Sequence, residues 1–193
     1  MLVGSDLTIS TLAGASNNVV NISGGQLTVT NGTLTVNGAG NNGSAQLNIS
    51  GGTVMVQQLI TTNAGGVINF NGGTIISQGT TVSNGLDFAI GNTGGAATFI
   101  ANGGTHTFQK NLIVGSSSSG NTLLITNGAT VFNTTGYIGN SNGANNNAVT
   151  VTGANSVWKN SSNLYVGYTN NTGNTLTIAT GGTVIDTAGY IGL

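Results

Sequence analysis

The feature that most constrains this sequence is an internal repeat with a period of about 26 residues, within the range typical of solenoid proteins. In each unit two apolar residues flank a third residue and are followed by glycine or a small polar residue. The units end near Ser10, Asn37, Thr62, Gly91, Gly115, Gly139, Gly167 and Gly192. Glycine-rich turns such as ISGGT and ANGGT keep the same spacing. Because so short a unit cannot bury an apolar face alone, the pattern predicts that consecutive units stack on one another.

Each unit is predicted to contain three short strands. The first ends at the glycine pair, as in QLNIS at 46–50, and the second follows that pair, as in TVMV at 53–56. The third is the LYVG-type element. Apolar and polar residues alternate in these runs, while glycine and asparagine are concentrated at the corners. Glutamate and arginine are absent, so the best exposed helix formers are missing and no helix is expected.

These observations predict one all-β domain over residues 1–193, a parallel β-solenoid with three strands per coil and seven to eight coils. At about 4.8 Å per coil, seven coils would give a rod roughly 34 Å long. A globular antiparallel sandwich is the alternative architecture. It would not require such regular repetition of both the side-chain face and the turn.

Three segments in the second half of the chain resemble the autotransporter- and PEP-CTERM-associated repeat family. They are GYIGNSNG from Gly136, SVWKNSSNLYVG from Ser156 and GGTVIDTAGYIG from Gly181. The resemblance is close from about Gly103 to Leu193 and looser before that. It implies a right-handed parallel β-helix of passenger-domain type, and a place in a bacterial surface or secreted protein. The motif is specific to an architecture rather than to an activity.

The composition excludes several function classes. Glycine, threonine and asparagine supply 34, 30 and 29 of the 193 residues, and the formal net charge is −1. The only charged side chains are Asp6, Asp87, Lys110, Lys159 and Asp186. Two lysines cannot neutralise a nucleic-acid footprint, and the absence of cysteine excludes disulfides and thiolate metal sites. No apolar run approaches the roughly 18 residues of a membrane span, and the first residues do not resemble a signal peptide.

No constellation of catalytic residues is found. Paired-carboxylate hydrolysis needs two carboxyl groups within roughly 5 to 9.5 Å, whereas Asp6 and Asp87 are expected three coils, roughly 14 Å, apart. The sequence contains no GxSxG nucleophile motif that the lone histidine, His106, could activate, so His106 is interpreted as a strand residue near a corner. The glycine pairs are followed by threonine or glutamine rather than by aspartate, unlike calcium-binding β-rolls. We therefore predict no enzymatic activity, cofactor or metal.

Two outward features are candidates for contact with other molecules. Tyr137, Tyr165 and Tyr190 precede the last apolar residue of three successive third strands, and their rings are predicted to stack along the rod. This column would be a contact strip for glycans or for a neighbouring rod, with Trp158 adding to it. Alternatively, it only stabilises the stack, each pair adding about 0.5 to 1.5 kcal/mol.

One cross-coil ion pair is also predicted. Lys159 in SVWKN and Asp186 in TVIDT fall at corresponding places in consecutive second strands. Both are expected to face solvent, which would turn Trp158 and Ile185 inward. The pair would contribute about 1 kcal/mol or less.

The sequence therefore favours a non-catalytic, extracellular structural segment: a surface stalk, an adhesin shaft or a self-assembling fibre subunit. Its partners would be flanking repeats of a longer chain or other copies joined head to tail. A carbohydrate-binding or adhesive module that uses the tyrosine column is the alternative. Ice binding is more remote, because the outward row expected on the first strand is broken by Phe99 and Leu124. That row is expected to consist of Asn21, Asn48, Asn69, Phe99, Leu124, Thr150 and Thr177.

Overall fold

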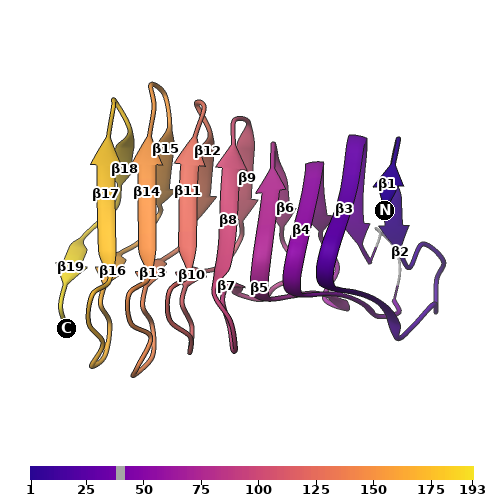
Figure 1. Cartoon of the computed structure of the whole chain (residues 1–193), viewed down its shortest axis with the longest axis horizontal. Helices are drawn as coiled ribbons and strands as arrows, with labels where there is room; N and C mark the ends of the chain where they lie inside the picture. Colours follow the sequence, from indigo (N-terminus) through magenta and orange to yellow (C-terminus); the bar gives the residue numbers. More distant parts are fainter. Residues whose placement is uncertain (38–41) are drawn as a thin grey trace.

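Strands from successive turns of the chain lie side by side along a rod (Figure 1). The structure is a computed structural model that describes residues 1–37 and 42–193. These residues form strands, all paired in parallel, and contain no helix. The described strands form eight layers, about seven full turns of the chain, so the predicted right-handed parallel β-helix is confirmed. The same residues include no helix long and apolar enough to cross a membrane.

Each turn contributes one strand to each of three columns, which we number in chain order. The first column holds β1 (Leu2–Val3), parts of β3 (Asn18–Val36), β4 (Ala45–Thr61) and β5 (Gly66–Ser77), then β8 (Ala97–Asn102), β11 (Thr122–Thr126), β14 (Ala148–Thr152) and β17 (Thr175–Ala179). The second holds β2 (Leu7–Ile9), parts of β3 and β4, then β6 (Thr80–Val82), β9 (Thr105–Phe108), β12 (Thr130–Asn133), β15 (Val157–Asn160) and β18 (Thr183–Ile185). The third holds parts of β3, β4 and β5, then β7 (Phe88–Ile90), β10 (Leu112–Val114), β13 (Gly136–Ile138), β16 (Leu164–Val166) and β19 (Gly189–Ile191).

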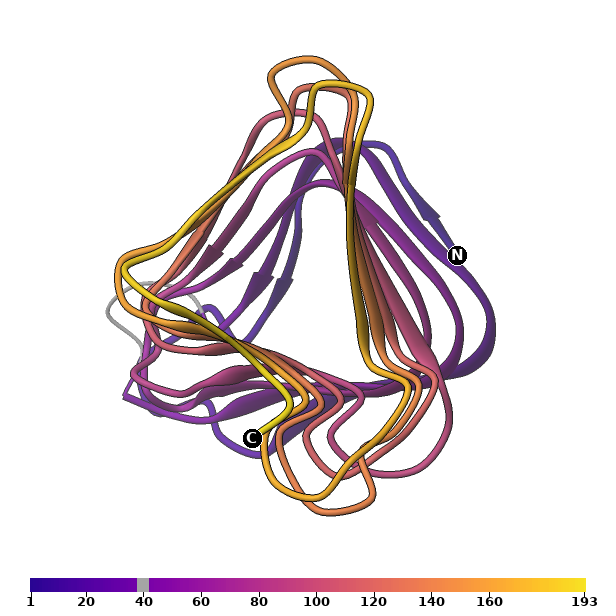
Figure 2. The ribbon, with the colours of Figure 1, turned by 90° about the vertical axis from the view of Figure 1, so that its left-hand side faces the viewer.

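Seen along its axis the rod is triangular, with one column on each side (Figure 2). Alternate side chains point inward because successive residues of a strand face opposite sides. In β11, for example, Leu123 and Ile125 are fully buried, while Thr122 and Leu124 on the outer side are partly exposed. Inward Leu, Ile, Val and Phe side chains from every turn make one continuous core. The core also holds Trp158, the largest fully buried side chain.

The turns differ in length at their corners. The side chain of Asn69 donates a hydrogen bond to that of Asn48, 21 residues earlier, on the neighbouring turn. The side chain of Asn133, in contrast, donates to that of Asn160, its register partner 27 residues later. The predicted period is therefore an average. The strands keep their register from turn to turn, and the corners absorb the difference in length.

The predicted assignment of strands to columns is wrong in the first half of the chain. The elements ending at Ser10, Asn37 and Thr62 were predicted as third strands but lie in the second column, where residues 34–36 pair with β2 and Leu59 pairs with Thr80. Residues 45–49, predicted as a first strand, lie in the third column. The glycine pair accordingly precedes the first column in the early turns and the second column in later ones. Strands on all three sides share one alternation and the same corner residues, so the local pattern does not distinguish the sides.

Glycine and asparagine interlock at the corner that follows the third column. Gly115 has φ of +79°, which favours glycine, and a Cβ there would lie 2.2 Å from the Asn147 side chain. Asn147 is fully buried; its carbonyl oxygen accepts hydrogen bonds from the backbone and side-chain nitrogens of Asn121, at 2.9 and 2.8 Å. Its amide donates to Ala144 O and to the side chain of Asn174. This asparagine ladder satisfies buried backbone groups where the chain changes direction.

Candidate functional site

The three predicted tyrosines form the stack that the repeat implied. Tyr137, Tyr165 and Tyr190 are in register on β13, β16 and β19. Their ring centroids are 5.1 and 5.0 Å apart, with interplanar angles of 12° and 11°. The ring of Tyr168 also contacts the column, 5.6 Å from Tyr137 and 5.0 Å from Tyr165, tilted by 66° and 60° to these rings. The predicted stacking of these three tyrosine rings along the rod is therefore confirmed.

Within the stack, neighbouring tyrosine rings cover one another's faces. A sugar binds an aromatic side chain through an exposed face, but in this column Tyr137 and Tyr165 lie face to face, as Tyr165 and Tyr190 do. Burial, the phenols of Tyr165 and Tyr168 and the carboxylate of Asp87 raise the pKa of Tyr137, so this phenol stays neutral at physiological pH. The arrangement favours stabilisation of the turns over a flat aromatic platform for ligands.

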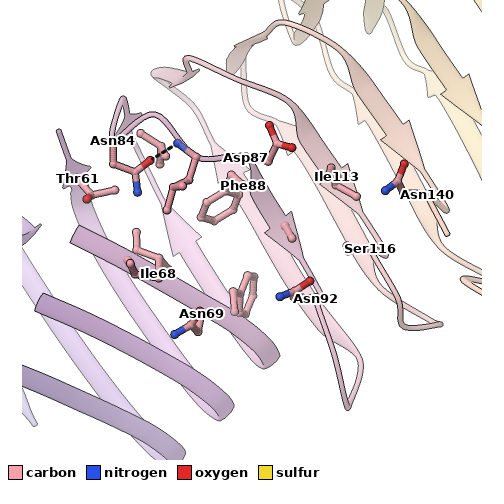
Figure 3. Close-up of a pocket in the computed structure, with 15 residues that line it drawn as sticks. Thr61, Ile68, Asn69, Asn84, Asp87, Phe88, Asn92, Ile113, Ser116 and Asn140 are labelled. Carbon is pink, nitrogen blue, oxygen red and sulfur yellow. Dashed lines mark hydrogen bonds between the residues drawn. The ribbon is translucent and has the colours of Figure 1, made fainter. Parts of the chain in front are cut away.

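A cleft of about 360 Å³ lies on the same side of the rod, in turns that precede the tyrosine stack (Figure 3). It marks a break in the third column. Residues 66–70 of β5 belong to the 14-stranded sheet, whereas β7 is the first strand of a separate 5-stranded sheet. At the end of β7 the Gly91 N–H still donates to Phe70 O, at 2.9 Å, so the turns remain stacked beside the break.

The cleft combines an apolar floor with polar walls. Ile68, Phe88 and Ile113 lie on successive turns, and Figure 3 shows them between the polar side chains. Asn84 is nearly buried; its amide donates to Gly66 O and its carbonyl oxygen accepts from the Leu86 N–H. The remaining polar side chains of the lining are Thr61, Asn69, Asp87, Asn92, Ser116 and Asn140. The described residues that line the cleft include no lysine or histidine, so they offer no positive charge to an anion.

Sequence reasoning did not identify this cleft. Its residues come from four turns, and the first half of the chain was assigned to the wrong columns, so Asn69 was not aligned with Ala89 and Ile113. The sequence does contain one signal, since Ala89 is a small residue at a position that carries tyrosine in later turns.

The predicted ion pair is wrong. Lys159 is opposite Ile185, which is 46% exposed and faces outward rather than inward. Asp186 follows Ile185 on the other side of the strand, and lines a cavity at the open end of the last turn together with Leu176 and Val184. The register therefore differs from the prediction by a single position at this point. Trp158, on the same strand as Lys159, is buried as predicted.

The three carboxylates lie in separate turns. Asp6 accepts a hydrogen bond from the Thr33 N–H at 2.8 Å, and Asp87 accepts one from the Asn111 N–H at 3.1 Å. Each of these two carboxylates thus ties its own turn to the next one. Within residues 1–37 and 42–193, no three histidine or acidic side chains gather where they could hold a metal ion.

His106 is a core residue. It is fully buried on β9, with Nδ1 3.0 Å from Thr80 Oγ1 and Nε2 2.9 Å from Gly103 O, and its ring meets Phe99 edge to face. Nε2 donates to the Gly103 carbonyl oxygen in the neutral Nε2–H tautomer, and the single proton of the Thr80 hydroxyl is shared between Nδ1 and Ser77 Oγ, 3.1 Å away. Burial lowers the pKa of His106, an effect that the hydrogen bond to Gly103 partly opposes.

This burial predicts a loss of stability in mild acid. The folded state binds a proton at His106 less readily than the unfolded chain, whose histidine has a pKa of about 6.5. The free energy of unfolding should therefore be independent of this group above pH 6.5, and fall below it by up to about 1.4 kcal/mol per pH unit. Urea titrations between pH 7.5 and 5 would measure this. The non-titrating variant His106→Gln should lose the slope, and an unchanged slope would show that another group causes it.

The outward row predicted for the first strands is also wrong. Asn21, Asn48 and Asn69 lie in the third column as a hydrogen-bonded ladder, and Phe99 is buried. The outward rows of the first column are Gln26, Thr53, Thr74, Thr98, Thr122, Ala148, Thr175 and, beside them, Thr28, Met55, Ile76, Ile100, Leu124, Thr150, Thr177. Within these two rows threonines face each other only at Thr175 and Thr177. The paired array that ice binding requires is therefore not formed by the described residues on this side.

Comparison with known proteins gives no relative: no protein family, no curated protein and no solved structure matches this chain.

Proposed function

We propose that this chain is a rod-forming, non-catalytic segment of a bacterial surface stalk or adhesin shaft, working outside the cell. The observation that carries the proposal is the register of the columns. Strands of successive turns pair in parallel along the rod, so turns can be added without a change in cross-section. The scattered carboxylates, two of which bond to the next turn, and the tyrosines that stack on one another fit the same role.

The open end of the last turn supports stacking on a further turn. Leu176, Ile178, Val184 and Ile191 line an apolar cavity of about 240 Å³ there, and Ile178 and Ile191 are 52% and 85% exposed. Each of them continues a buried inward row, so another β-solenoid turn would cover them as earlier turns are covered. A glycan-binding role for the tyrosine column has less support, because neighbouring rings within the column cover one another's faces.

Asp186 distinguishes between the two kinds of partner at this end. It continues an inward row in which Asn133 donates to Asn160 at 2.7 Å, and the buried amide nitrogen of Asn160 has no hydrogen-bond partner among the described residues. A following turn would need a donor over Asp186. A second copy stacked in register would instead place Ile9, the inward residue at this position of its own first turn, against the carboxylate. An in-register fibre of identical copies would therefore bury Asp186 without a partner.

Asp186→Val should therefore increase end-to-end association of the purified chain. Burying an uncompensated carboxylate costs several kcal/mol, so the variant should associate at concentrations at least about tenfold lower than the unmodified chain at pH 7.5. Sedimentation velocity over a concentration series would measure this, with electron microscopy to show whether the particles are rods. Lys159→Val, on the outer side of the preceding turn, is the matched charge-removing control. Equal association of the three proteins would refute the role of Asp186, and compact particles instead of rods would refute the proposed function.

A further inference from the structure

We propose that the cleft at the break in the third column binds a neutral oligosaccharide that lies along the rod. This site is separate from the tyrosine column and does not depend on the structural role proposed above. The break leaves a hollow because the outward row that runs along this side contains a small residue there. Ala89 is followed by Ile113 and then by Tyr137 on the next two turns, so the surface rises from the cleft towards the stack.

The lining chemistry argues against anions, calcium and large hydrophobic ligands. Anions would need a positive charge, and the described lining residues contain neither lysine nor histidine. Calcium takes six to eight oxygen ligands, usually from several carboxylates, and Asp87 is the only carboxylate among the described residues of the lining. A large hydrophobic ligand would leave the polar walls without partners. The mixture of amide, hydroxyl and apolar groups fits best a neutral ligand with both apolar and hydroxyl-rich surfaces.

The polar groups suit sugar hydroxyls. The amides of Asn69, Asn92 and Asn140 each offer a donor and an acceptor, and vicinal hydroxyls need both. One oxygen of Asp87 is held by the Asn111 N–H, so the carboxylate is fixed and its second oxygen is available to accept from a hydroxyl. Phe88 packs against Phe99 and Phe108 in the core, so the apolar contact with a sugar ring would come from Leu86, which is 47% exposed, and from the partly exposed Ala89.

The row of polar side chains sets the direction of the ligand. The Ser116 N–H donates to Gly91 O and the Asn140 N–H donates to Gly115 O, so Asn92, Ser116 and Asn140 occupy one position in three successive turns. At about 4.8 Å per turn, this edge offers a polar group at regular intervals along the axis. In Figure 3 these three side chains follow one another on successive turns beside the floor. An extended chain of sugars parallel to the rod would meet one polar side chain per turn.

A binding screen with a blocking variant tests the proposal. The full chain would be screened against soluble neutral oligosaccharides of glucose, mannose, galactose and N-acetylglucosamine, with uronate and sulfated oligosaccharides as the charged comparison. We expect a neutral oligosaccharide to bind, Ala89→Trp to abolish binding by filling the cleft, and Asn92→Ala to weaken it about tenfold, as the loss of one good hydrogen bond would. Thr107→Trp, at an outward position of the second column, should bind normally and controls for the added bulk.

Several results of this screen would overturn the proposed binding site. Binding that survives Ala89→Trp, a preference for the charged panel, or no binding to any neutral oligosaccharide would overturn the assignment. Loss of binding in Tyr165→Ala with normal binding in Ala89→Trp would overturn it as well, and would move the site to the tyrosine column. Circular dichroism of each variant would confirm that the β-solenoid is intact. None of these results affects the test of the rod by sedimentation and microscopy.

Discussion

Replacing Trp158 by alanine should lower the free energy of unfolding by about 3 to 5 kcal/mol, the usual cost of removing a fully buried large aromatic side chain. The indole fills the core of the seventh turn, and its Nε1–H donates to Asn133 Oδ1 at 2.7 Å. The substitution would leave both a cavity and a buried acceptor without this donor. Urea denaturation followed by far-ultraviolet circular dichroism would measure the change, since the indole is the only tryptophan and fluorescence would be lost with it.

Two variants control this experiment. Trp158→Phe keeps most of the volume but removes the N–H, so it should cost less, about 1 to 3 kcal/mol. Phe132→Ala, on the neighbouring turn, removes an outward aromatic side chain that is 37% exposed, and should cost about 1 kcal/mol or less. If Phe132→Ala were as destabilising as Trp158→Ala, the inward and outward sides of the second column would have to be exchanged.

Asn147→Ala should cost about 2 to 4 kcal/mol, although asparagine is a small polar residue. The substitution would leave the buried Asn121 N–H without its acceptor and Ala144 O without its amide donor, and each unsatisfied buried group costs about 1 to 3 kcal/mol. The same denaturation experiment applies. Asn142→Ala, an exposed residue of the same corner, should change stability by less than about 0.5 kcal/mol. Similar values for the two variants would contradict the proposed role of the asparagine ladder.

The features that repeat could be predicted from the sequence. Inward leucines, isoleucines and valines recur with the period of the turns, so the fold class and the direction of Trp158 followed from the pattern. The stacked tyrosines were predicted for the same reason, because Tyr137, Tyr165 and Tyr190 share one position in three successive motifs. A residue that recurs at the same place in several motifs shows which positions of successive turns are equivalent.

The features that the sequence did not predict correctly depend on how one turn is aligned with the next. A shift of one residue in register exchanges the inward and outward sides of a strand, which is what separated Lys159 from Asp186. The number of residues at the corners varies from turn to turn. The local sequence of a strand does not show which of the three similar sides it occupies. The same error hid the cleft, whose Asn69 and Ala89 belong to turns that differ in length.

The hydrogen bonds between turns point along the rod, and this direction governs how it would bear a mechanical load. A pull on the two ends acts along these bonds rather than across them, so the turns separate one after another instead of sliding together. Between β5 and β7 the third column changes from one sheet to another, and only the other two columns are joined there by regular strand pairing. Extension would therefore begin at this junction. Because the cleft lies there, tension on the rod and ligand binding would act on the same turns.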